Sequence, residues 1–184
     1  MMSGMRAHVV VSVFFLLVAV PASAAEIDPK SLALHQRDVP SGFVLDRDAS
    51  GPRTNESEAS GDRRARALFK RWGRVSGYQT EYKRQEATLT SRVDLFRTSR
   101  GAELFIAYIV EEAKKSGIKG LRRSPVRIGA GGWFYGGGSG SSAIGFVVWR
   151  HTRVFAGVVA LGIPRTPILA LARAQQRRIA AAVS

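Results

Sequence analysis

Apolar residues recur at helical spacing in a stretch before the middle of the chain. Ala65, Leu68, Phe69 and Trp72 lie at positions i, i+3, i+4 and i+7, with basic residues mostly between them. This spacing predicts an amphipathic helix over residues 60–72 that packs one face against a core.

Capping residues and periodicity predict two more helices. The first covers residues 98–115, with a Thr or Ser cap at its start and two lysines in its last turn, as the helix dipole favours. The second covers residues 166–182 and has Pro167 at its first position, where proline is tolerated. Each helix has an apolar face that must pack against another element.

Alternating apolar and polar residues predict β-strands. Residues 78–83 and 89–95 alternate in this way, and we expect them to form an antiparallel pair. The carboxylates of this pair, Asp94 among them, alternate with basic residues, which is typical of a solvated face with exposed salt bridges. Further strands are expected over residues 43–47, 133–135, 142–150 and 153–161.

The order of these elements predicts the fold class. Only His151 and Thr152 separate the last two strands, which is the length of a hairpin connection. We therefore expect one α+β domain, with an antiparallel sheet of about five to six strands covered by helices on one face. Residues 25–61 form an irregular N-terminal part of this domain, with one short strand and a loop over 50–61, and residues 62–184 form its body.

The first 24 residues have the pattern of a signal peptide. An apolar run of 12 residues, Val9 to Val20, precedes the small-residue pattern Ala22-Ser23-Ala24. The run is shorter than a membrane span requires, so we expect cleavage and export to the periplasm or the exterior, with an uncleaved anchor as the alternative. The chain has no cysteine, which excludes a lipoprotein anchor, a disulfide framework and thiolate metal sites.

Charge is unevenly distributed along the chain. Residues 26–61 have a net charge of −3 and residues 62–184 a net charge of +16, and no acidic residue follows Glu112. Arginine-rich amino-acid usage explains part of this excess, whereas the missing carboxylates favour an anionic partner, and both explanations stay open. The basic residues expected to bind an anion are Arg122, Arg123, Arg127, Arg173, Arg177 and Arg178.

The sequence contains no clear pattern for catalysis or for binding a metal or cofactor. Only His35 and His151 remain after signal cleavage, and His151 is expected in an exposed turn. Residues 136–142 are rich in glycine and serine, but a strand rather than a helix follows them, unlike a phosphate-binding loop. The aromatic residues 133–135 are expected in the core, although they could border a ligand. We assign no catalytic, metal or cofactor residue.

Several short segments resemble landmarks of a known fold family. They are residues 38–43, residues 73–78, residues 93–98 followed by Gly101 and Ala102, and Trp149 with Arg150. Together they resemble small exported bacterial proteins with a PsbP/Mog1-like α+β sandwich, over most of residues 36–182. The resemblance implies a non-enzymatic accessory or binding module.

Two classes of function agree with these features. The first is an exported binding module that engages an anionic envelope polymer, a lipid head-group surface or an acidic protein. The second is a small secreted hydrolase or other enzyme whose site the sequence does not reveal. Nucleic acid is not expected as a partner, because export separates the chain from most of it. No membrane span is expected in the mature chain, and its oligomeric state is left open.

Overall fold

The computed structural model describes residues 27–115, 118, 120–138 and 143–183, so the expected signal peptide, residues 1–24, lies outside the described residues. The strands are β1 (Val44–Arg53), β2 (Arg74–Arg84), β3 (Ala87–Phe96), β4 (Arg122–Pro125), β5 (Ala130–Gly137), β6 (Ile144–His151) and β7 (Val154–Leu161). The helices are α1 (Pro29–Leu32), α2 (Asn55–Ala59), α3 (Arg63–Arg71), α4 (Ser99–Lys115) and α5 (Arg165–Val183), with a 3₁₀ turn at Gln36–Asp38.

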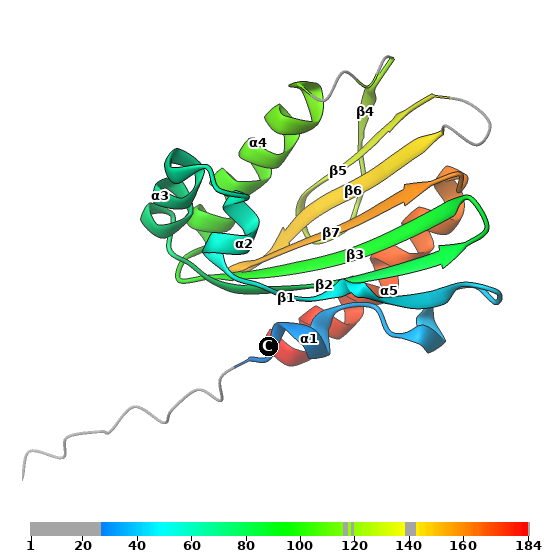
Figure 1. Cartoon of the computed structure of the whole chain (residues 1–184), viewed down its shortest axis with the longest axis horizontal. Coiled ribbons are helices and arrows are strands. Elements are labelled where there is room, and N and C mark those ends of the chain that lie inside the picture. Colours follow the sequence, from blue (N-terminus) through cyan, green and yellow to red (C-terminus); the bar gives the residue numbers. More distant parts are fainter. Residues whose placement is uncertain (1–26, 116–117, 119, 139–142, 184) are drawn as a thin grey trace, which may run out of the picture.

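The strands form one antiparallel sheet in the order β1-β2-β3-β7-β6-β5-β4 (Figure 1). The expected α+β class is confirmed, with seven strands in place of five to six. β2 and β3 form the expected pair, and β6 and β7 form the expected hairpin. Because β7 inserts between β3 and β6, the two most apolar strands lie in the middle of the sheet.

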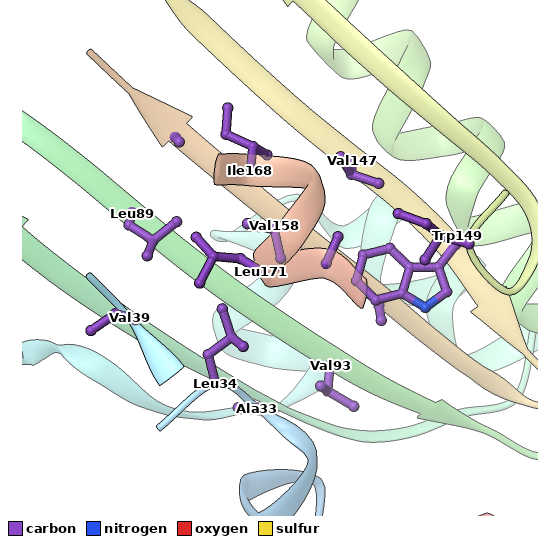
Figure 2. Packing of buried hydrophobic residues seen from close by; sticks show 14 of the residues in the cluster. Ala33, Leu34, Val39, Leu89, Val93, Val147, Trp149, Val158, Ile168 and Leu171 are labelled. Carbon is purple, nitrogen blue, oxygen red and sulfur yellow. The ribbon is translucent and has the colours of Figure 1, made fainter. Parts of the chain in front are cut away.

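Helices cover both faces of this sheet, and the expectation that they cover one face is wrong. On one face Ile168 and Leu171 of α5 share a buried cluster with Val147, Val158 and Trp149 of β6 and β7 (Figure 2). On the other face Phe69 of α3 and Phe105 of α4 share a core with alternate residues of β6 and β7. Both faces need cover because β6 and β7 are apolar on both sides, as central strands commonly are.

A buried cluster of charged side chains joins β2 and β3 to α2. Arg74 and Asp94 are fully buried and form an ion pair, in which Nε of Arg74 donates a hydrogen bond to Oδ1 of Asp94 at 2.9 Å. Arg92 donates to the other carboxylate oxygen of Asp94 at 2.6 Å and to Glu58 of α2 at 2.8 Å. Gly77 lies against this cluster, and a Cβ atom there would overlap Asp94 and Arg74.

The expectation that Asp94 lies on a solvated face of the strand pair is therefore wrong. Two elements that strand alternation does not locate cover this end of β3: α2 provides Glu58, and α4 provides Phe105, whose ring centroid lies 5.2 Å from the guanidinium carbon of Arg92. The alternation of charges along β3 correctly indicates ion pairs, but these pairs lie inside the protein.

The segment expected as a loop over residues 50–61 contains regular structure. β1 continues to Arg53, and Thr54 caps α2 by accepting a hydrogen bond from the backbone N–H of Ser57 at 3.1 Å. α2 buries only Ala59, so its sequence has no apolar periodicity to indicate a helix. The short edge strand β4 is likewise missing from the expected elements.

Candidate functional site

A cleft of about 360 Å³ lies between α4 and the β4–β5–β6 end of the sheet. It exists because α4 packs mainly on β3, β6 and β7, which leaves the outer strands uncovered on this face (Figure 1). Ile106 and Val110 of α4 form an apolar wall, and Trp133 and Tyr135 of β5 form the opposite wall. The volume lies within the range of small-molecule sites in proteins.

The conformation of β5 determines which of its side chains face the cleft. Its pairing with β6 shifts register between Ala130 and Trp133, and Gly131 has a φ of +65°, in the region that favours glycine. After this bulge the strand alternates, so Trp133 and Tyr135 point to the α4 side while Phe134 packs with α5. Tyr135 stacks on Phe146 of β6 with a centroid distance of 4.6 Å, which holds this wall in place.

Two arginines line the same cleft. The guanidinium carbon of Arg123 lies 4.4 Å from the ring centroid of Trp133, in a cation–π contact. Arg150, near the end of β6, pairs with Ala130 across the bulge and lines the cleft beside it. With the residues that the structure describes, neither arginine forms an ion pair.

The other charges that line the cleft are compensated. Lys114 pairs with Glu111 at 2.5 Å, and Glu103 pairs with Arg100 at 2.9 Å. The hydrogen bond from Lys114 holds the pKa of Glu111 below its ordinary value. Arg123 and Arg150 thus leave the cleft with a surplus of positive charge beside an aromatic wall.

The six arginines expected to bind an anion do not gather at one place. Arg122 and Arg123 are adjacent on β4 and therefore point to opposite faces of the sheet, Arg123 toward the cleft. Arg178 is used internally: it donates to Asp38 at 2.7 Å and to the carbonyl oxygen of Ala33 at 2.6 Å. The other three, Arg127, Arg173 and Arg177, are exposed and lie outside the cleft lining.

His151 ends β6, and the exposed turn expected there falls at Thr152–Arg153 instead. The side chain of His151 is part of a hydrogen-bond chain on the α5 face. Nε1 of Trp149 donates to Oε1 of Gln176 at 2.7 Å, and Nε2 of Gln176 lies 3.0 Å from Nδ1 of His151. Because the indole can only donate, the amide of Gln176 donates to Nδ1, which places the proton of the neutral imidazole on Nε2.

Sequence reasoning missed Arg150 as a residue of a site, and it placed Trp133 in the core with a ligand contact only as the alternative. Trp133 is half-buried and Arg150 is partly exposed, whereas Phe134 and Tyr135 are buried as expected for residues 133–135. The available signal was the alternation along β6, which puts Arg150 on the same face as Phe146 and Val148. A charged residue that follows buried apolar residues on the same face of a strand indicates where that face reaches the solvent.

A metal site and a membrane-spanning helix each have requirements that the described part of the chain does not meet. Residues 27–115, 118, 120–138 and 143–183 contain no group of three or more His, Asp or Glu side chains arranged to hold a metal ion. Within the same residues, no helix combines the length and the apolar composition that crossing a membrane requires.

Comparison with known proteins supports the fold. No protein-family model and no curated protein sequence matches the chain. Among solved structures, the extracellular domain of PknH from Mycobacterium tuberculosis is similar, with a TM-score of 0.53 and 12% sequence identity, over 83% of this chain and 94% of that chain. At this identity the likeness shows the fold alone, which this chain shares with a bacterial extracellular domain. The resemblance to the PsbP/Mog1-like sandwich is not confirmed.

Proposed function

We propose that the protein is an exported binding module that takes a small anionic ligand, with an apolar part, into the cleft between α4 and the β4–β5–β6 end of the sheet. One observation carries the proposal: Arg123 and Arg150, which have no carboxylate partner among the described residues, line a cleft walled by Trp133 and Tyr135. The sequence predicts an anionic envelope component as partner. The size of the cleft limits what can enter it to a small molecule or a single head group.

The two kinds of group in the cleft fit the two parts of such a ligand. A guanidinium recognises a carboxylate or phosphate through paired N–H donors, and such charge-assisted hydrogen bonds are stronger than neutral ones. The ring of Trp133 and the apolar wall of α4 would bury the uncharged part of the ligand. Because Arg123 already lies over the Trp133 ring, it is held near the position in which an anion would meet it.

The alternative expectation, a small secreted hydrolase, finds no support in the cleft. Neither His35 nor His151 belongs to its lining, and the side-chain nitrogen Nδ1 of His151 is bound to Gln176 on the opposite face. We therefore infer binding rather than hydrolysis as the function of this site.

Calorimetric titration of the purified exported protein with dodecyl phosphate and with dodecyltrimethylammonium tests the proposal. We expect the phosphate to bind and the ammonium not to bind. Each of Arg123→Gln and Arg150→Gln should weaken binding of the phosphate about tenfold, since a hydrogen bond to a charged group contributes about 1.5–3 kcal/mol and a tenfold change corresponds to about 1.4 kcal/mol.

Arg71→Gln on α3 is the matched control, because it removes the same charge from an exposed position outside the cleft. Its affinity for dodecyl phosphate should equal that of the unchanged protein, and circular dichroism should show that all variants are folded. Equal binding of the two amphiphiles, or full affinity in the protein that lacks both cleft arginines, would refute the proposal.

A further inference from the structure

The outward ridge of α5 has two neighbouring arginines flanked by small residues. Its buried residues face the sheet, and the residues that point away from the sheet follow helical spacing. These outward residues are Thr166, Ala170, Arg173, Arg177 and Ala181. Arg173 and Arg177 are therefore exposed, and the other residues of the ridge have short side chains.

Other arginines extend this ridge on the side of α5 that faces β4 and β5. Arg165 lies 4.8 Å from the ring centroid of Phe134 and donates to Oγ of Ser124 at 3.1 Å, which fixes it beside β4. Arg127 is exposed on the connection from β4 to β5, and two residues later Gly129 lies against the side chain of Gln176 in α5. From Arg165 to Arg177 the helix rises about 18 Å, at about 1.5 Å per residue.

The arginines of this face have no carboxylate partner among the described residues. No acidic residue follows Glu112 in the sequence, and two carboxylates of the N-terminal segment are already hydrogen-bonded. Asp38 is bound to Arg178, and Asp28 caps α1 by accepting a hydrogen bond from the backbone N–H of Lys30 at 2.9 Å. With the described residues, Arg127, Arg165, Arg173 and Arg177 form no ion pair.

The shape of the face favours an extended flat partner over a polymer chain. A polymer is held best in a groove, and the recess beside α5 has Asp38 and Pro40 on one wall and Pro167 and Ala174 on the other, with no arginine in its lining. The arginines instead project from the ridge and from the β4 side. We propose that this α5 face, formed by Arg127, Arg165, Arg173 and Arg177, docks on an anionic lipid bilayer surface.

The docking is electrostatic, and it leaves the cleft open. Each basic side chain near an anionic bilayer contributes attraction that fades within a Debye length, about 8 Å at physiological salt. The α5 face and the cleft lie on opposite faces of the sheet, because Phe134 packs with α5 while Trp133 lines the cleft. A docked protein would thus present its cleft away from the lipid.

Sedimentation with phosphatidylglycerol–phosphatidylcholine vesicles and with phosphatidylcholine vesicles tests this second proposal. The protein should bind the anionic vesicles only, and its affinity should fall steeply with added salt. The triple substitution Arg127→Gln, Arg173→Gln and Arg177→Gln should weaken binding about a hundredfold, which corresponds to about 3 kcal/mol at about 1.4 kcal/mol per tenfold change. Its melting temperature should be unchanged, because these side chains make no ion pair with the described residues.

A matched control removes the same charge from the opposite face. The triple substitution Arg63→Gln, Arg64→Gln and Arg71→Gln on α3 should weaken vesicle binding far less. Equal losses in the two triple variants would mean that net charge alone binds the vesicles, and this would overturn the proposal. It would also be overturned if the α5 variant lost binding to soluble polyphosphate while keeping its affinity for vesicles.

The cleft and the α5 face can be tested separately. The protein with Arg123→Gln and Arg150→Gln should keep its affinity for vesicles, and the α5 triple variant should keep its affinity for dodecyl phosphate. Loss of vesicle binding in the cleft variant, with full binding in the α5 variant, would assign the lipid contact to the cleft and overturn the α5 proposal alone.

Discussion

Replacing Asp94 by Asn should destabilise the protein strongly, because this carboxylate is shared by two guanidiniums and is the ion-pair partner of the buried Arg74. It accepts hydrogen bonds from Arg74, which is fully buried, and from Arg92, whose side chain is 16% exposed. Asn is nearly the same size, so the substitution removes charge and leaves the packing in place. Arg74 would then lie buried near Arg92 with no carboxylate of its own.

The size of the effect follows from the burial of the pair. Removing one partner of a buried ion pair costs about 3–5 kcal/mol, since the remaining charge is left without compensation in a medium of low dielectric. That is a large part of a typical unfolding free energy of about 5–15 kcal/mol. For a chain of this size we expect the melting temperature to fall by roughly 6–20 °C, at about 2–4 °C per kcal/mol.

Urea unfolding followed by circular dichroism measures the loss, and an unchanged m-value shows that the unfolded states are comparable. A second variant separates charge from packing: Arg74→Met with Asp94→Leu removes the pair and leaves Arg92 with Glu58, so it should recover most of the stability. Glu103→Gln, which breaks an exposed pair with Arg100, should leave the midpoint nearly unchanged. A loss below about 1 kcal/mol for Asp94→Asn would refute the reasoning.

Two further substitutions test the neighbourhood of Gly77 and the N-terminal segment. Gly77→Ala should lower the melting temperature, because its Cβ atom would overlap the Asp94 carboxylate, and overpacking of this kind costs about 1–3 kcal/mol; unchanged thermal unfolding would contradict the geometry. Burial of Asp38 raises the pKa of its carboxyl group. Hydrogen bonds from the backbone of His35 and from the side chain of Arg178 lower this pKa by more than burial raises it, so the pKa lies below its ordinary value. A lowered pKa stabilises the fold above the unfolded value of about 3.9, and this contribution is lost as the pH falls through the folded pKa. Asp38→Asn should therefore be less stable at pH 7, and its deficit should shrink in urea titrations near pH 3; a deficit independent of pH would argue against this.

Elements with a local signal could be predicted from the sequence. The apolar spacing from Ala65 to Trp72 predicts α3, and the alternation over residues 78–83 and 89–95 predicts the paired strands β2 and β3. Short elements give no such signal, because α2 buries a single alanine and β4 has four residues at the edge of the sheet. Their existence depends on partners far away in the sequence, such as the β5 residues that pair with β4.

The candidate site could be predicted only in part, because sequence counts charges without giving their directions. The acid-free stretch after Glu112 predicts a positive field, but it does not show where the charged side chains lie. Whether a given arginine is available depends on its neighbours in space: Arg178 meets Asp38, 140 residues earlier in the chain, and Arg123 meets Trp133 through the pairing of β4 with β5. Those contacts follow from the assembled sheet, and no local pattern encodes them.

The end of β6 gives the two surfaces a shared mechanical element. Arg150 lines the cleft, and the side chains of its immediate neighbours Trp149 and His151 take part in the hydrogen-bond chain with Gln176 of α5 on the other face. If β6 shifts when a ligand enters the cleft, the hydrogen-bond chain would transmit that shift to α5 on the opposite face of the sheet. Thermodynamic reciprocity then requires that any change in lipid affinity caused by an occupied cleft be matched by an equal change in cleft affinity on the membrane.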